Sequence, residues 1–281
     1  MSSLSTIAGN YDAILSDVWG VVHNGVAAHP AAVDALCRFR EAGGRVVLIT
    51  NAPRPSPDII DMLDDLAVPV EAYDAVVSSG DVTRAMLVPY RGQTLHYVGP
   101  AEENDGLFEG LDITLGAPED ARAVIVTDLD NDDQTPDDYS DRITTWLARK
   151  LPMICANPDR VVEHGDQLIY CGGALADLYE ARGGMIHMAG KPYRPIYDEA
   201  LLVAEKVAGR SLDRGRILAI GDSVRTDAIG AANAGLDLLF VTGSIHAGEL
   251  DAFGSPDPDA IRALVAPSGA RLKAFMPRLA W

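Results

Sequence analysis

The chain has 281 residues, of which 48% are hydrophobic and 23% are charged, and its formal net charge is -18. This composition is typical of a folded globular protein and argues against intrinsic disorder. The length exceeds that of a usual single domain, so we expect a core and one further module. The acidic charge disfavours nucleic acid and anionic membranes as partners, because both bind to basic surfaces.

The N-terminal segment and the cysteines predict a cytoplasmic protein. Residues Met1 to Asn10 have neither the basic start nor the apolar stretch of a secretory signal. No segment approaches the roughly 18 apolar residues of a membrane-spanning helix. Cys37, Cys155 and Cys171 are odd in number, widely spaced and without a CxxC pair, which indicates buried thiols in a reducing compartment.

The first part of the chain predicts strands and helices in alternation. In order, we expect a buried strand, a helix that begins with proline, and a second buried strand over residues 12–18, Pro30 to Arg40 and Arg45 to Ile49. Such units build parallel sheets, in which ligands bind beyond the carboxyl ends of the strands. Asp17 and Thr50 both stand at such ends.

From about Gly80 the pattern changes, and we predict a second α/β module inserted into the first. Its expected elements are a helix, two strands, a helix and two strands, over Asp81 to Val88, Thr94 to Val98, Arg122 to Thr127, Thr135 to Lys150, Met153 to Ala156 and Gln167 to Cys171. The core pattern resumes after Gly183-Gly184. We therefore assign residues 1–79 and 184–281 to the core and residues 80–183 to the insert.

An acidic stretch within the insert has two interpretations. Its aspartates are Asp128, Asp130, Asp132, Asp133, Asp137 and Asp138. A calcium loop would need glycine at Asp133 and glutamate at Tyr139. The sequence favours a solvated loop that leads into a helix capped by Thr135, with Pro136 in its first turn.

The last part of the chain completes the predicted core. Its expected elements alternate between strand and helix over Met185 to Met188, Pro195 to Val207, Arg216 to Ile220, Thr226 to Ala234, Leu238 to Val241 and Pro258 to Leu264. The strand that ends at Ile220 is followed by Gly221 and Asp222, and Asp227 comes five residues later. These two carboxylates therefore stand near another strand end.

Four positions of the core carry groups suited to phosphoryl transfer. They are Asp17, Thr50-Asn51, Lys191 in a Gly-Lys-Pro sequence, and the pair Asp222 and Asp227. Read singly, each is as readily a loop, cap or surface residue. Together they supply the carboxylate nucleophile, hydroxyl, ammonium and acidic pair that a magnesium-dependent aspartyl-phosphate site requires.

This set of positions resembles the four sequence motifs of the haloacid dehalogenase (HAD) superfamily, over essentially the whole chain. The insert resembles the α/β cap domain found in class IIA members. The sequences of that class are also resembled by three short segments, Ser78-Ser79-Gly80, Asn157-Pro158-Asp159 and Gly190-Lys191-Pro192. The resemblance implies a Rossmann-like parallel-sheet core with an inserted α/β cap. Characterised members of this class are mostly phosphatases of small molecules, such as nucleoside monophosphates and 4-nitrophenyl phosphate.

The resemblance also implies roles in catalysis and metal binding. Asp17 would be the nucleophile that forms an aspartyl-phosphate. Mg²⁺ would be held by Asp17, Asp222 and the backbone carbonyl of Trp19, with Asp227 supporting the metal shell. A magnesium-dependent hydrolase of small phosphorylated metabolites is thus the expected function.

Further residues are implied for the substrate. Thr50, Asn51 and Lys191 would bind the phosphoryl group, and Thr50 and Lys191 would act in catalysis. In the cap, residues around Asn157, Asp159 and Arg182 would contact the rest of the substrate. The expected partner is a small phosphorylated metabolite, and a homodimer is compatible with the resemblance.

Trp19 departs from the family pattern, which has a second aspartate two residues after the nucleophile. The family's aspartate protonates the leaving group, a contribution of about 10²- to 10⁴-fold. Three alternatives remain open: a phosphatase for esters with good leaving groups, a ligand-binding or regulatory protein with little turnover, and dehalogenase or phosphonatase chemistry. His23 is the histidine nearest to a motif, and we expect a structural role for it.

Overall fold

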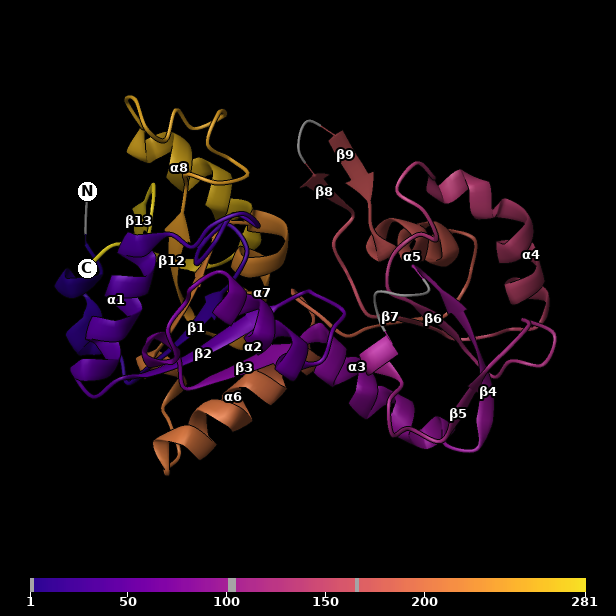
Figure 1. The fold of residues 1–281 in the computed structure, drawn as a ribbon. Helices are drawn as coiled ribbons and strands as arrows, with labels where there is room; N and C mark the ends of the chain where they lie inside the picture. Colours follow the sequence, from indigo (N-terminus) through magenta and orange to yellow (C-terminus); the bar gives the residue numbers. More distant parts are fainter. Residues whose placement is uncertain (1–2, 101–104, 165–166) are drawn as a thin grey trace. The chain divides into compact units, whose positions relative to one another are not determined.

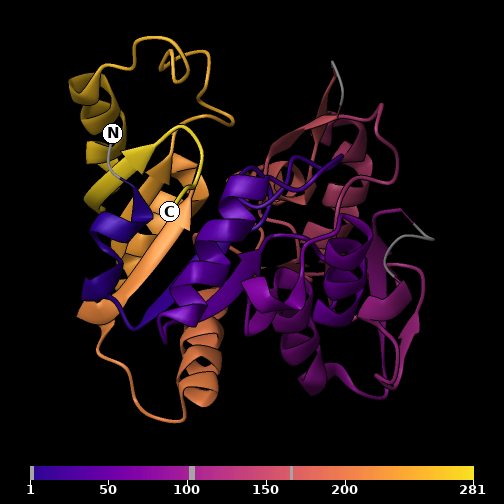
Figure 2. The same cartoon turned by 60° about the vertical axis from the view of Figure 1, so that its left-hand side comes forward.

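The computed structural model describes residues 3–100, 105–164 and 167–281. The chain divides into two compact units, drawn from two directions in Figures 1 and 2. The first unit comprises Met1–Thr50, Ile59–Val77 and Lys191–Trp281, and the second comprises Asn51–Asp58 and Ser78–Gly190. Within the described ranges, no helix combines the length and apolar character needed to cross a membrane.

The first unit is built on a six-stranded sheet in the order β13-β12-β11-β1-β2-β3. The strands, in chain order, are β1 (Ala13–Asp17), β2 (Arg45–Thr50), β3 (Ala75–Ser78), β11 (Ile217–Gly221), β12 (Asp237–Val241) and β13 (Arg271–Met276). The pairs from β13 through β2 are parallel. Every residue of β1, β11 and β12 is buried, as expected for central strands covered on both faces.

Helices α1, α6, α7 and α8 belong to this unit, and α2 begins in the second unit and continues into it. Their bounds are α1 (Pro30–Glu41), α2 (Ser56–Asp65), α6 (Arg194–Ala208), α7 (Ile229–Ala234) and α8 (Pro258–Val265). Helix α1 starts with proline and buries one face of small and large apolar residues. Helix α6 packs on β2 (Figure 1) and ends at Gly209, whose φ of 66° closes the helix in a left-handed conformation.

The second unit has its own five-stranded parallel sheet, in the order β10-β7-β6-β4-β5. These strands are β4 (Gln93–Val98), β5 (Ile113–Leu115), β6 (Val124–Val126), β7 (Met153–Cys155) and β10 (Ile186–Met188). Helices α3 (Ser79–Leu87), α4 (Ser140–Ala148) and α5 (Gly172–Ala181) and an antiparallel hairpin, β8 (Val161–His164) with β9 (Gln167–Tyr170), complete it. One apolar cluster is centred on Trp146, Tyr139 and Tyr179, and another contains Leu87 and Leu95.

Five strands differ from the sequence expectation: β3, β5, β8 and β13 are not predicted, and β10 joins the other sheet. Residues Met185 to Met188 are predicted to resume the core, but β10 pairs with β7 in the sheet of the second unit. A three-residue apolar strand carries no local sign of which parallel sheet it joins, so only its partner decides. Strand β13 is not predicted because its sequence contains charged residues and has no continuous apolar run. Its partly exposed residues suit the edge position that it occupies in the sheet.

The acidic stretch forms a helix cap, as predicted, in its second half. The Asp138 carboxylate accepts hydrogen bonds from the backbone N–H and the hydroxyl of Thr135, at 2.7 and 2.9 Å. The helical turn Pro136–Tyr139 follows and continues into α4. The first aspartate behaves otherwise, because Asp128 is partly buried and not solvated. It stands two residues after the end of β6, where the chain is still inside the unit.

The cysteines are free thiols. Cys155 and Cys171 are buried, as expected, whereas Cys37 is half-buried. Burial raises the pKa of the Cys155 and Cys171 thiols well above the ordinary value. Because the thiolate is the reactive form, both thiols are inert at neutral pH.

Candidate active site

Asp17 ends β1 in the interior of the first unit. It is 6% exposed, and its Oδ1 accepts a hydrogen bond from the backbone N–H of Val18 at 2.7 Å. In the sheet, Asp17 lies opposite Ile49 of β2, and Ser16 lies opposite Ile220 of β11. The carboxyl ends of three adjacent parallel strands therefore lie at the same level. Residues that follow β2 and β11 are brought next to Asp17 for this reason.

Asp227 is held by the backbone that follows β11. Its Oδ2 accepts hydrogen bonds from the N–H groups of Asp222 and Ser223, at 3.2 and 3.1 Å. A wide helical turn, Val224–Ala228, brings Asp227 back over the strand end. Gly221 makes room for it, because a Cβ at this position would lie 2.1 Å from Asp227 Cγ. The Gly221-Asp222-Ser223 segment thus provides the space and the two N–H donors that hold the Asp227 carboxylate.

Lys191 joins two of the carboxylates. Its Nζ lies 2.6 Å from Asp17 Oδ1 and 2.7 Å from Asp227 Oδ1, and the residue is 2% exposed. Burial by itself would lower the pKa of Lys191, but the charges of Asp17 and Asp227 outweigh burial and raise it well above the ordinary value. The side chain is therefore a permanent cation at neutral pH.

The three aspartates form a compact group of oxygen ligands. One carboxylate oxygen from each of Asp17, Asp222 and Asp227 lies within 4.8 Å of the others. Burial, and next the charge of Asp227, raises the pKa of Asp17 well above its usual range and that of Asp222 to about 7. The single ammonium of Lys191 does not neutralise three buried carboxylates. A hard divalent cation, which prefers oxygen ligands, complements this donor set.

Gly20 brings the segment after Asp17 against Asp222. Its φ is +79°, and a Cβ there would lie 2.1 Å from Asp222 Oδ2 and 2.5 Å from Ser244 Oγ. Only glycine fits this conformation and this close approach. The backbone around Trp19 and Gly20 therefore borders the carboxylate group. Ser244 is a site residue that sequence reasoning missed, because nothing in its local pattern marks it.

Trp19 places an indole two residues after Asp17, where the resemblance leads us to expect a carboxyl group. The residue is 54% exposed, so it does not belong to the core. Its six-membered ring lies against Gly25, where a Cβ would come within 2.4 Å of Trp19 Cη2, and its centroid lies 5.2 Å from that of His23 in an edge-on arrangement. The indole is thus held by a local loop and offers no group that can donate a proton to an ester oxygen.

His23 is neutral and structural, as expected. It is 1% exposed, and its Nδ1 accepts a hydrogen bond from the N–H of Gly25 at 2.9 Å, which leaves the ring proton on Nε2. Burial, assisted by the nearby His29, lowers the pKa of His23 to about 4. A buried imidazole with this pKa is not an acid catalyst at neutral pH.

Thr50 and Asn51 adjoin the division between the units. Thr50 ends β2 and is 7% exposed, so the register places it near Asp17 in the first unit. Asn51 is the first residue of the second unit, and its Nδ2 donates to Asp159 Oδ1 at 3.0 Å. The two residues of this motif are therefore held by different parts of the protein.

The cap residues named from the sequence do not form one group. Asn157 Nδ2 donates to Asp128 Oδ1 at 2.9 Å, and Asn157 Oδ1 accepts from the N–H of Asp159 at 3.2 Å. Arg182 follows the far end of α5 and donates to Ser140 Oγ at 3.1 Å. A ten-residue helix is about 15 Å long, so Arg182 lies well away from the other two.

Asp128, which the sequence places in a solvated loop, joins this network instead. Its Oδ1 also accepts a hydrogen bond from the N–H of Gly172, the first residue of α5, at 3.2 Å. Burial raises the pKa of Asp128 to about 7, against the opposing hydrogen bonds from Gly172 and Asn157. Its position just after an apolar strand is the one sequence signal that could have identified it.

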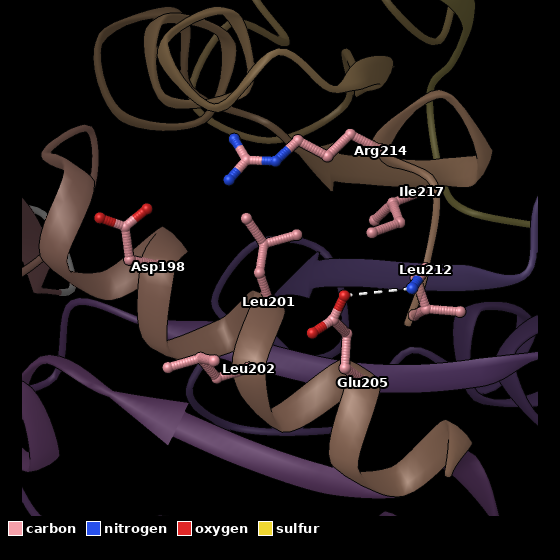
Figure 3. A pocket seen from close by; sticks show the side chains of 7 residues that line it. All are labelled: Asp198, Leu201, Leu202, Glu205, Leu212, Arg214 and Ile217. Carbon is pink, nitrogen blue, oxygen red and sulfur yellow. Dashed lines mark hydrogen bonds between the residues drawn. The ribbon is translucent and has the colours of Figure 1, made fainter. Parts of the chain in front are cut away.

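A separate pocket of about 270 Å³ lies on the first unit (Figure 3). It is lined by Asp198, Leu201, Leu202, Glu205, Leu212, Arg214 and Ile217. Figure 3 shows the Glu205 carboxylate, which accepts a hydrogen bond from the N–H of Leu212 at 3.1 Å. Ile217 begins β11, whereas Asp222 follows the end of this strand. The pocket therefore lies at the amino ends of the strands, and the carboxylates lie at their carboxyl ends.

Comparison with known proteins identifies the family. A family model described as haloacid dehalogenase-like hydrolase matches residues 14–112, and a second, described as HAD-hydrolase-like, matches residues 188–266. A p-nitrophenyl phosphatase from Archaeoglobus fulgidus is 19% identical, with a TM-score of 0.70 over 96% of this chain and 97% of that one. A magnesium complex of glycerol phosphate phosphatase from Mycobacterium tuberculosis is 24% identical, with a TM-score of 0.66 over 91% and 74% of the respective chains. These two likenesses show the fold.

A hydrolase of the haloacid dehalogenase-like family from Brucella suis 1330 is much more similar. It is 42% identical, with a TM-score of 0.86 over 99% of each chain. The prediction of a parallel-sheet HAD core with an inserted α/β module is confirmed. This chain belongs to the haloacid dehalogenase-like hydrolase family.

Proposed function

We propose that the protein hydrolyses phosphate monoesters of small molecules, with Asp17 as the nucleophile. The observation that carries the proposal is the 2.6 Å contact between the buried carboxylate of Asp17 and the buried ammonium of Lys191. An anionic nucleophile can approach an anionic phosphate only where fixed cations offset their repulsion. The similar proteins described as p-nitrophenyl phosphatase and glycerol phosphate phosphatase support this substrate class.

The residues present fit a magnesium ion. Three carboxylates supply oxygen ligands within 4.8 Å of one another. We propose that Asp17, Asp222 and the backbone carbonyl of Trp19 hold Mg²⁺ and that Asp227 supports the shell. When bound, the ion would neutralise phosphate charge and orient the phosphoryl group. The similar glycerol phosphate phosphatase, solved in complex with magnesium and in complex with calcium, supports a divalent cation at this site.

The proposed reaction has two steps. A carboxylate oxygen of Asp17 forms a bond to phosphorus while the bond from phosphorus to the ester oxygen breaks, and the ester oxygen leaves with that electron pair as an alkoxide or aryloxide, which takes a proton from water. Water then cleaves the aspartyl-phosphate, which releases inorganic phosphate and restores the carboxylate. Thr50, Asn51 and Lys191 bind the phosphoryl oxygens. Because Lys191 also contacts Asp227, its ammonium stays in place when Asp17 becomes esterified.

The environment of Trp19 limits the substrates that react well. Neither the indole nor the neutral His23 can protonate a departing oxygen at neutral pH. The leaving group must therefore depart as an anion, which favours aryl and acyl phosphates over alkyl and sugar phosphates.

A hydrolysis screen with added Mg²⁺ tests the proposal. The panel contains aryl, acyl, alkyl and sugar phosphates, with 2-haloacids and phosphonoacetaldehyde for the other chemistries of the superfamily. We expect phosphate release from aryl and acyl esters that stops on metal chelation and in an Asp17→Asn variant. Halide release or phosphonate cleavage without ester hydrolysis would contradict the proposal. Tight phosphate binding without turnover would indicate a binding or regulatory protein instead.

A further inference from the structure

Two of the places where the chain passes between its units adjoin proposed phosphate-binding residues. One is the peptide bond from Thr50 to Asn51, and the other is the bond from Gly190 to Lys191. In each pair, the residue of the first unit belongs to the candidate active site. Whatever holds Asn51 and Gly190 therefore restrains Thr50 and Lys191 through a single peptide bond.

Asn51 and Gly190 contact each other within the second unit. A Cβ at Gly190 would lie 2.4 Å from Asn51 Oδ1 and 2.8 Å from Pro158 Cδ. These distances are too short for any side chain, so the absence of a Cβ is what allows the approach. The two chain segments are thus packed side by side, next to the Asn157-Pro158-Asp159 turn.

Asp159 secures this contact from the same turn. Its Oδ1 accepts a hydrogen bond from Asn51 Nδ2 at 3.0 Å, and the bond is partly buried. A charged acceptor makes such a bond roughly twice as strong as a neutral one. The carboxylate therefore sets the orientation of the Asn51 amide, whose other atom faces Gly190.

Asp159 is itself anchored in the body of the second unit. Its N–H donates to Asn157 Oδ1 at 3.2 Å, and its carbonyl accepts from the N–H of Gly173 in α5 at 3.0 Å. Asn157 in turn donates to Asp128 at 2.9 Å, and Asp128 also accepts from the N–H of Gly172 at 3.2 Å. A continuous series of hydrogen bonds thus leads from α5 and the end of β6 to Asn51.

We propose that Asp159 is a positioning residue for the phosphoryl site, which it serves by fixing Asn51 against Gly190 and so placing Thr50 and Lys191. This inference rests on the proposed function. It differs from the family-based expectation, in which Asn157 and Asp159 bind the substrate. A carboxylate in contact with a phosphate dianion would repel it, so we assign Asp159 a place behind the Asn51 amide and not on the phosphoryl oxygens. Both polar ends of the Asn157 amide are engaged inside the unit.

Variants at two positions disturb the same contact from opposite sides. Asp159→Ala removes the acceptor for Asn51, and Asp159→Asn keeps an oxygen acceptor without the charge. Gly190→Ala adds a methyl group 2.4 Å from Asn51 Oδ1 and serves if Asp159→Ala does not fold. Asp120→Ala is the matched control, because Asp120 is an exposed aspartate of the same unit outside this network.

Kinetics with several phosphate esters separate positioning from substrate contact. A misplacement of the phosphoryl-binding groups by about 1 Å lowers the rate by about 100-fold, so we expect kcat/KM of Asp159→Ala to fall about 10- to 100-fold. In Asp159→Ala, kcat/KM should fall by the same factor for every ester. The variant should also be inhibited less strongly by inorganic phosphate. Asp159→Asn should stay within about fivefold of the natural protein, as only charge assistance is lost. A loss confined to certain esters, with phosphate inhibition unchanged, would show that Asp159 contacts the leaving group.

Hydrogen–deuterium exchange gives a readout that does not depend on turnover. We expect faster exchange in peptides that contain Asn51 and Lys191 for Asp159→Ala and Gly190→Ala, and no change for Asp120→Ala. Unchanged exchange in both peptides of a folded Asp159→Ala variant would overturn the inference. If the natural protein cleaves no phosphate ester, the proposed function fails, while the exchange comparison still decides whether Asp159 holds this contact.

Discussion

The ammonium of Lys191 lies 2.6 Å from Asp17 and is also bound by Asp227, so the proposed nucleophile and the cation beside it belong to one buried ion-pair network. The two partners are 174 residues apart in the chain, yet each follows from a local feature: a strand end for Asp17 and a Gly-Lys-Pro segment for Lys191. We therefore expect substitutions of Asp17, Asp222 and Asp227 to have different effects.

Asp17→Asn should abolish phosphate ester hydrolysis. The amide has the same shape and can still accept hydrogen bonds from Val18 and Lys191, but it cannot attack phosphorus. Removal of a catalytic nucleophile costs about 10⁴-fold or more in kcat. Steady-state assays of the purified variant, with its thermal unfolding midpoint as a check on folding, measure the effect. Turnover comparable to that of the natural protein would mean that Asp17 is not the nucleophile.

Asp222→Asn should weaken metal binding more than Asp227→Asn does, whereas Asp227→Asn should lower stability more. Asp227 is bound to Lys191 and to two backbone N–H groups, so its amide variant leaves buried partners unsatisfied. Breaking a buried ion pair costs about 3–5 kcal/mol. Asp222→Asn should weaken Mg²⁺ binding more but unfold less readily. Calorimetric Mg²⁺ titration and urea unfolding of both variants check the two orders, and a reversed order of metal affinity would exchange their roles in the shell.

Trp19→Asp should speed the hydrolysis of alkyl phosphates more than that of aryl phosphates. The new carboxyl group can protonate a poor leaving group, worth about 10²- to 10⁴-fold where protonation limits the rate. Because the indole is 54% exposed, its loss should cost less than the about 3–5 kcal/mol of a fully buried aromatic residue.

The measurement for Trp19 is kcat/KM against leaving-group pKa for both proteins. We expect a steep decline in the natural protein and a shallower one in the variant. A flat dependence in the natural protein would show that another group already donates the proton. His23→Asn is the useful control, since the buried imidazole should have no part in this dependence.

Asp128→Asn should change the pH dependence of stability. In the folded protein the carboxyl keeps its proton up to about pH 7, whereas the usual pKa is 3.8. The unfolded chain therefore binds fewer protons between these values, and the contribution of Asp128 to stability falls as the pH rises from about 4 to 7. The groups that face it are Asp159, Cys155 and Cys171, of which the thiols stay protonated in this range.

The amide of Asp128→Asn cannot ionise, so the variant should gain stability relative to the natural protein as the pH rises. At about 1.4 kcal/mol per pH unit, the full difference is at most ~4 kcal/mol, and the partial exposure of the side chain reduces it. Urea unfolding from pH 4 to 8 gives this difference directly. A constant difference over that range would show that Asp128 is ionised throughout.

Much of the candidate site could be predicted because its residues follow apolar strands. Asp17, Thr50 and Asp222 each come directly at or after such a run, and parallel pairing then places these ends side by side. The hydrophobic runs also predicted the central strands of both sheets, since burial on two faces needs continuous apolar residues. The helix cap at Thr135 followed from equally local chemistry.

The tertiary structure alone decided how these groups interact. Asp128 is partly buried, β10 joins the second sheet, and Asn51 turns toward Asp159, because each depends on partners far away in the chain. The sequence by itself determined which side chains stand at the strand ends, since a strand's apolar pattern is local. Which of them are charged, paired or turned inward depends on desolvation and on contacts between distant segments, and only the folded chain creates those.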